Sequence, residues 1–244
     1  MPDWIFWMPP ETTLYGMALF AASIWIAHVL TTLGAAAFFR VMHKRNILPE
    51  RRVANGKPPP DKLIRLAWID RAIAYPAYLG VLALILYPMF AWRGAALGLE
   101  WPGLGEMALH IALSALINET IFYWGHRLLH NKRMFRLVHR KHHAFRQVRT
   151  VSCEYAHPLE NLLNLIALYA GPLMLGSALP TLIVWETLRM IETCDAHSGY
   201  DFDSVASRHA FHHRYPTKGC YGTGLGLWDW LMGTDNEWRE KRAA

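Results

Sequence analysis

The histidines of this chain are gathered in one part of the sequence. Ten of the thirteen lie between positions 126 and 213, and eight of those ten form three tight clusters. The clusters are His126 with His130, His139 with His142 and His143, and His209 with His212 and His213. Imidazole is a common metal ligand. Because a shared metal centre would draw on all three clusters, the fold must bring them together.

Within each cluster the spacing favours one face of a helix. His126 and His130 are four residues apart, and the other two clusters repeat spacings of three and four, which are neighbouring positions on a helical surface. His157 and His197 stand between the second and third clusters and are further candidates. So many nitrogen ligands exceed the needs of one ion and suit two. Imidazole binds zinc, copper, iron and nickel alike, so ligand type alone does not identify the metal.

Four apolar segments define the expected fold. They are residues 14–39, 72–92, 104–124 and 162–188. The first contains no Asp, Glu, Lys or Arg and is long enough to span a bilayer. The last is broken near Pro172 and Pro180, which predicts a helical hairpin. We therefore expect an all-α, integral membrane helical bundle of about three spanning helices plus this hairpin, with a cytosolic helical cap that carries the histidines.

The charge distribution gives an orientation and a division of the chain. Lys and Arg are frequent in residues 40–71 and again in 127–149, whereas the loop 93–103 has one. The positive-inside rule then places the basic loops and all three clusters in the cytoplasm. The net charge of +6 accompanies apolar runs, which favours an anionic lipid surface over nucleic acid. We expect a transmembrane region, 1–125, and a histidine-rich catalytic region, 126–244, that includes the hairpin.

The chain resembles the fatty acid hydroxylase and sterol desaturase superfamily, which are membrane-bound di-iron enzymes with histidine boxes. The resemblance is carried by YWGHRLLH at 123–130, HRKHH at 139–143, YAHPLE at 155–160, HSG at 197–199, HAFHH at 209–213 and WDWLMGT at 228–234. It implies an oxidoreductase, a monooxygenase-type enzyme of lipid biosynthesis. Two irons, with zinc as a possible substitute, would activate O2 and oxidise a C–H bond of a membrane lipid.

An external reductase or cytochrome is expected to supply the electrons, because the sequence has no flavin or nicotinamide fingerprint. The glycine-rich stretch 219–226 neither follows a strand nor opens a βαβ unit, so it is interpreted as a turn.

The expected metal ligands are His126, His130, His139, His142, His143, His157, His197, His209, His212 and His213. His157, which precedes a proline, is nearly as well explained by a supporting role. Ligating histidines usually pass their second N–H to a carboxylate or a carbonyl. Candidates for that role are Glu119, Glu160, Glu192, Asp195 and Asp229, and Asn118 and Tyr123 are considered with them. His28, His43 and His110 are expected to have no part in the metal site.

Two other functions remain open at this stage. A membrane protein that binds or transports transition metals should place ligands along a path through its spanning segments, whereas here they lie beyond one end of them. A zinc hydrolase is a weaker alternative, because no HExxH motif is present. Neither the lipid nor the choice between hydroxylation and desaturation follows from the sequence.

Overall fold

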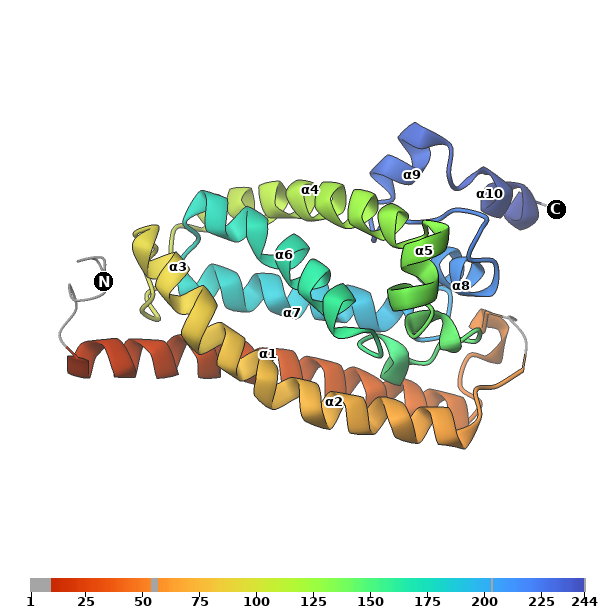
Figure 1. Ribbon diagram of the computed structural model, residues 1–244, viewed down its shortest axis with the longest axis horizontal. Coiled ribbons are helices and arrows are strands. Elements are labelled where there is room, and N and C mark those ends of the chain that lie inside the picture. The colour runs from red at the N-terminus through yellow and green to blue at the C-terminus, as the bar shows by residue number, and fades with distance from the viewer. Residues whose placement is uncertain (1–9, 54–56, 203, 244) are drawn as a thin grey trace.

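The computed structural model of the protein describes residues 10–53, 57–202 and 204–243. These residues form helices and connecting loops but no strand, apart from one isolated bridge between Arg52 and Tyr200 (Figure 1). The helices are α1 (Pro10–Lys44), η2 (Pro49–Arg51), α2 (Asp61–Val81), η3 (Leu82–Leu86), α3 (Tyr87–Trp92), α4 (Leu104–Leu129), α5 (Lys132–Met134), η4 (Phe135–His139), η5 (His142–Ala144), η6 (Thr150–Ser152), α6 (Pro158–Leu175), α7 (Leu179–Ala196), α8 (Val205–Arg214), α9 (Leu227–Met232) and α10 (Asn236–Ala243). The prediction of an all-α helical membrane fold is confirmed.

Two helical segments of the described residues are long and apolar enough to cross a membrane. They are Leu14–Lys44, within α1, and Asp61–Trp92, which runs through α2, η3 and α3. The third expected span, α4, does not join them, because Asn118 and Glu119 are among the polar residues that interrupt its apolar sequence.

The helix formed by α2, η3 and α3 stays continuous past two prolines. Pro76 lies inside α2, and Pro88 opens α3 directly after the π-helical turn η3. A proline lacks the N–H that would bond to the preceding turn and crowds the carbonyl four residues earlier. A π turn at this point widens the backbone and accommodates the ring. The helix therefore keeps its length.

The predicted hairpin is present as the antiparallel pair α6 and α7 (Figure 1). The chain turns at Gly176, whose φ of 63° is the left-handed conformation that ends many helices at a glycine. Pro172 lies inside α6, and Pro180 lies in the first turn of α7, where a proline is well tolerated. The break expected near these prolines therefore lies between them.

Close helix packing positions the histidine-bearing end of the bundle. A Cβ added at Gly171 of α6 would lie 2.7 Å from Ser114 Cα of α4, and one at Gly125 would lie 2.8 Å from a Leu163 methyl carbon. Small residues of this kind let two helices approach closely. On the other side, α1 packs along α7. The ends of α4 and α7 meet η4, η5 and α8 at one end of the molecule, where the histidines gather (Figure 1).

Candidate metal centre

Nine histidines form two neighbouring groups whose ring nitrogens converge. Within each group the nearest nitrogens all lie within 4.8 Å of one another. The first group, which we call group A, is His126, His130, His139, His143 and His212; the second, group B, is His142, His197, His209 and His213. Segments from four parts of the chain supply these histidines. The fold thus forms one set of five ligands and one set of four.

The sequence spacing determines which histidines share a group. The pairs four residues apart stay together: His126 with His130, His139 with His143, and His209 with His213. The adjacent pairs divide between the groups, because neighbouring side chains on a helix point about 100° apart. His142 thus belongs to group B and His143 to group A, and the pair at 212 and 213 is split in the same way. Each adjacent pair thereby ties one group directly to the other.

The spacing had suggested that the second cluster lies on one face of an α-helix, but the structure shows that it does not. His139 ends the π-helical segment η4, and His142 and His143 begin the 3-10 turn η5. Such irregular turns often occur at functional sites in helical proteins. Despite the change of helix type, His139 and His143 share group A while His142 belongs to group B.

The nitrogen positions fit metal ions. His139 Nε2 lies 3.0 Å from Nε2 of both His126 and His143. His209 Nε2 lies 2.9 Å from His197 Nε2 and 3.0 Å from His213 Nε2. Two nitrogens held about 2.1 Å from one ion would be about 3.0 Å apart at right angles and about 3.4 Å apart in a tetrahedron. The observed separations therefore suit ions with five or six ligands better than a tetrahedral structural zinc.

The electrostatics of the site also favour metal binding. Burial, reinforced by the neighbouring imidazoles, lowers the pKa of His142, His143, His209, His212 and His213 well below the ordinary value of 6.5. Burial lowers the pKa of His197 to about 4. The imidazoles are therefore neutral near pH 7 and have lone pairs free for an ion. A metal ligand must be in this deprotonated form.

Backbone carbonyls orient three of these rings, and a carboxyl lies beside a fourth. The Nδ1 atoms of His126, His197 and His212 each lie 2.8 Å from a carbonyl oxygen, of Tyr221, Thr193 and Gly219 respectively. Glu160 Oε2 lies 2.9 Å from His139 Nδ1, and burial raises the pKa of Glu160 to about 8. When Nδ1 donates to a carbonyl, as in His126, His197 and His212, Nε2 is left as the acceptor that faces the metal.

The glycine-rich stretch 219–226 has a larger role than the sequence indicated. It is a turn, as predicted, but its carbonyls at Gly219 and Tyr221 hold two ligands of group A. Asp229, which is fully buried, accepts hydrogen bonds from the backbone N–H groups of Tyr221 at 2.8 Å and Gly222 at 2.7 Å. A substituent on Gly222 would meet this carboxylate at 2.8 Å. In the sequence, Gly222 and Asp229 were the residues that could have indicated this role.

The predicted supporting carboxylates thus act in two ways. Glu160 lies beside a histidine directly, whereas Glu119, Glu192 and Asp229 hold the turn. Glu119 accepts from Leu227 N at 3.1 Å and from the Thr223 hydroxyl, and Glu192 accepts from Gly224 N at 2.6 Å. Asp195 lies near the end of α7, two residues before His197.

The structure does not bring His157 into either group. It is the N-cap of α6, where its Nδ1 accepts a hydrogen bond from Leu159 N at 3.2 Å. His43 and His110 also lie apart from the two groups: His43 Nε2 is 3.0 Å from Ser198 O, and His110 Nδ1 is 3.1 Å from Ser177 Oγ. His28 is buried in a separate polar cluster.

Asn118 and Tyr123 lie on α4 in the turns before His126. The Tyr123 hydroxyl is 3.2 Å from Thr234 Oγ1, so it joins α4 to the C-terminal segment. Asn118 is buried and lines the cavity beside the histidines.

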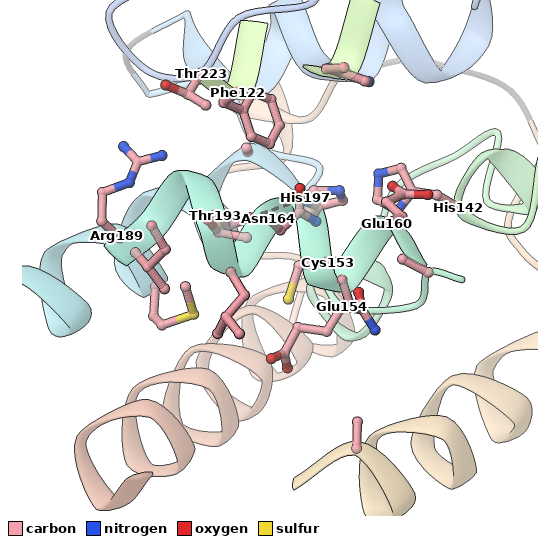
Figure 2. Close-up of a pocket in the computed structure, with 18 of the residues that line it drawn as sticks. Phe122, His142, Cys153, Glu154, Glu160, Asn164, Arg189, Thr193, His197 and Thr223 are labelled. Carbon is pink, nitrogen blue, oxygen red and sulfur yellow. Dashed lines mark hydrogen bonds between the residues drawn. The ribbon is translucent and has the colours of Figure 1, made fainter. Parts of the chain in front are cut away.

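One cavity of about 550 Å³ reaches the histidine groups. Its walls include His126, His139, His142, His197 and His209, together with apolar residues of α2, α4, α6 and α7. In Figure 2, His142, His197 and Glu160 lie at one end of the α6 segment, and Cys153 and Glu154 lie on its α1 side. Cavities of this size and character bind small molecules.

The chain has relatives among known proteins. The Fatty acid hydroxylase family pattern matches residues 111–234. The chain is 35% identical over 186 residues to a very-long-chain aldehyde decarbonylase of Oryza sativa subsp. indica, which covers 71% of this chain and 70% of the relative. It is 36% identical over 170 residues to a methylsterol monooxygenase of Arabidopsis thaliana, which covers 65% and 64%. It is 32% identical over 205 residues to a fatty acid hydroxylase domain-containing protein of Homo sapiens, which covers 82% and 61%.

No solved structure matches the chain. The family match includes all nine histidines of groups A and B, the turn 219–226 and Asp229. It leaves α1 and α2 outside. The match covers half of the chain, and the three relatives agree with it. The protein therefore belongs to the fatty acid hydroxylase family.

Proposed function

We propose that this protein is a membrane-bound di-iron enzyme that uses O2 to oxidise a C–H bond of a lipid. The observation that carries the proposal is the convergence of nine histidine ring nitrogens in two groups beside a largely apolar cavity, which five of these histidines line. The names of its relatives, a methylsterol monooxygenase and an aldehyde decarbonylase among them, support a lipid substrate.

Group A would hold one iron and group B the other. Iron bound there supplies the chemistry of O2 activation and C–H oxidation, which protein side chains lack. The chain's own residues hold the ligands in place: the carbonyls of Gly219, Tyr221 and Thr193 fix three imidazole orientations. The cavity walls would bind the apolar body of the lipid and exclude water from the reacting C–H bond.

An electron donor outside the chain completes the proposed reaction. Incorporation of one oxygen atom from O2 into a substrate consumes two electrons and two protons and forms water. The sequence carries no flavin or nicotinamide fingerprint. A reductase or cytochrome would therefore deliver the electrons at the exposed side of the histidine-bearing end.

The proposed location is a multi-pass membrane protein with its metal centre on the cytoplasmic face. Two spanning segments and the basic residues 127–149 support this orientation. Transport of metals is not favoured, because both groups lie at one end of the helices instead of along a path through them.

The first test measures metal and product together. Protein purified anaerobically in detergent should contain two metal ions per chain. With an added electron donor and O2, its lipid extract should show a product heavier by one oxygen or lighter by two hydrogens. One ion per chain after reconstitution with ferrous iron, or an unchanged lipid profile, would contradict the proposal.

The second test measures topology. The three native cysteines are first removed. One cysteine is then introduced at either Lys132 or Glu240, both of which are exposed. Both should resist an impermeant thiol reagent in intact cells and react after the membrane is opened. Labelling of one site alone in intact cells would separate the histidine clusters across the membrane and exclude a shared centre.

A further inference from the structure

A second buried cluster of charged residues lies apart from the metal ligands. His28 of α1 has its Nδ1 2.8 Å from Glu186 Oε1 of α7 and its Nε2 2.6 Å from Glu154 Oε1. Arg71 of α2 places Nη2 2.9 Å from Glu154 Oε2. We call these four residues the membrane-side cluster. Three of them lie on helices, and Glu154 lies on the loop before α6.

The hydrogen bonds determine the charge of the membrane-side cluster. A carboxylate only accepts, so both ring nitrogens of His28 must donate, and an imidazole with two N–H donors is positively charged. Two cations, His28 and Arg71, then face two anions, Glu154 and Glu186. The cluster is neutral as a whole.

A role in packing accounts for one half of the cluster. The side chain of Glu186 is 0% exposed, and its second oxygen accepts a hydrogen bond from the Tyr169 hydroxyl at 2.7 Å. This carboxylate joins α1, α6 and α7 and faces no open space. Its interactions are those expected of a polar contact between helices.

Packing does not account for Glu154. Its side chain is 22% exposed, and it lines the same cavity as the metal ligands, together with His28, Tyr75 and Tyr78. Charged groups within apolar helices are costly and commonly serve function. In Figure 2 the Glu154 carboxylate extends toward α1 from the loop that also carries Cys153. A charged acceptor is therefore presented at the wall of a largely apolar cavity.

Glu154 keeps capacity for one more donor. Its Oε1 accepts from His28, and its Oε2 accepts from Arg71 and, at 3.3 Å, from the Tyr75 hydroxyl. A carboxylate has about four acceptor positions. Three are occupied by protein groups, and the exposed part of the side chain leaves the fourth to a molecule in the cavity.

The cavity opens toward the apolar surface between α2 and α6. Ile73 of α2 is 69% exposed and Leu162 of α6 is 51% exposed, yet both also line the cavity. Since these two helices flank the opening with apolar side chains, a lipid can enter from the bilayer without crossing water.

We propose that the membrane-side cluster is a recognition site for the hydroxyl group of an uncharged lipid alcohol, whose O–H donates to Glu154 while its apolar body extends toward the metal centre. The inference rests on the proposed function and narrows its substrate class. A lipid carboxylate would be repelled by Glu154 and Glu186 and would find no free cation in a neutral cluster. An ether or a hydrocarbon would lack the donor.

Equilibrium binding to metal-loaded protein in detergent tests this site without turnover. The probes are tritiated octadecan-1-ol and tritiated cholesterol, each compared with its methyl ether, and tritiated octadecanoate. At least one alcohol should bind roughly tenfold to hundredfold more tightly than its own ether, the effect of a hydrogen bond to a charged acceptor. Octadecanoate should bind more weakly than octadecan-1-ol.

The matched variants are Glu154→Gln and Tyr169→Phe. Glu154→Gln keeps the side-chain shape and removes the charge, so the preference of alcohol over ether should fall by about tenfold. Tyr169→Phe removes a hydrogen bond from Glu186, which does not face the cavity, and should leave the preference unchanged. Metal content, measured in every preparation, reports the fold.

Three results would overturn the inference: equal affinity of both alcohols and their ethers in the parent, tightest binding of octadecanoate, or a full preference in Glu154→Gln. If Glu154→Gln does not fold, the comparison of alcohol and ether affinities in the unsubstituted protein still tests the inference. Alcohol preference in a protein that holds two ions but oxidises no lipid would instead contradict the proposed function and leave this site standing.

Discussion

The metal centre and the membrane-side cluster are both buried and polar, but they are built differently. Groups A and B use nine neutral histidines that each direct one ring nitrogen toward the others of the group. The membrane-side cluster uses one charged histidine whose two nitrogens are both taken by carboxylates. The same side chain is thus prepared for a metal in one place and for charge balance in the other.

The difference lies in what surrounds each ring. In groups A and B the outer nitrogens of three rings meet carbonyls and one meets a carboxyl that burial tends to keep protonated. Around His28 two carboxylates face the ring, and the charged form is held. A carbonyl partner leaves an imidazole neutral, whereas paired carboxylates favour imidazolium.

Loss of a metal ligand should have the largest effect. His212→Ala in group A and His142→Ala in group B should each abolish turnover and reduce metal content to one ion per chain or fewer, because each removes an inward nitrogen. Metal analysis and lipid profiling measure both. His110→Ala is the control, since this ring contacts Ser177 away from both groups. Full activity in His142→Ala would remove the basis of the metal-centre assignment.

Acid should destabilise the metal-free protein through groups A and B. Above pH 6.5 these histidines are neutral in both the folded and the unfolded chain and contribute nothing to the pH dependence. Below it the unfolded chain binds protons that the folded chain refuses, because burial lowers the pKa of the folded histidines. Each ring contributes up to about 1.4 kcal/mol per pH unit.

The measurement is thermal unfolding of metal-free protein in detergent between pH 7.5 and 5. Stability should fall steadily below pH 6.5, and bound metal should move that fall to lower pH. His197→Gln should reduce the slope. A metal-free protein that is as stable at pH 5 as at pH 7 would show that the rings are not held neutral.

His28→Ala should destabilise the fold by about 3–5 kcal/mol, because it leaves the fully buried Glu186 and the partly buried Glu154 without their shared cation. From the sequence, His28 was only expected to have no part in the metal site. Unfolding in mixed detergent micelles measures the loss. A double variant, His28→Ala with Glu186→Gln, should recover part of it, since one of the two charges is then gone. Wild-type stability in His28→Ala would show that the cluster is not charged.

The sequence predicted the metal centre better than the membrane-side cluster, for a physical reason. Ligands on one helix turn leave a spacing that can be read directly, as with His126 and His130. The contacts of His28 join residues 126 and 158 positions apart, and no local pattern records them. An isolated histidine in an apolar run looks the same whether or not two carboxylates meet it.

The fold shows the same limit on a smaller scale. The all-α class and the hairpin of α6 and α7 follow from apolar length and two prolines. The division of His142 and His143 between groups was not predicted, because the spacing was taken to place a whole cluster on one face, whereas adjacent side chains on a helix point about 100° apart. Nor does the turn 219–226 reveal its role, since carbonyl partners carry no residue signature.

The smallest effect is expected where support is indirect, at Asp229. This carboxylate touches no histidine but holds the backbone of Tyr221, whose carbonyl meets His126 Nδ1. Asp229→Asn should lower metal affinity by about 10–100-fold, as for other groups that orient ligands, while leaving the ligand set complete. Titration of metal-free protein with ferrous iron against a competing chelator measures this. Asp235→Asn is the matched control, because Asp235 is also buried but pairs with Arg239 on α10. Equal iron affinity in the two variants would mean that the turn carries the carbonyl of Tyr221 without help from Asp229.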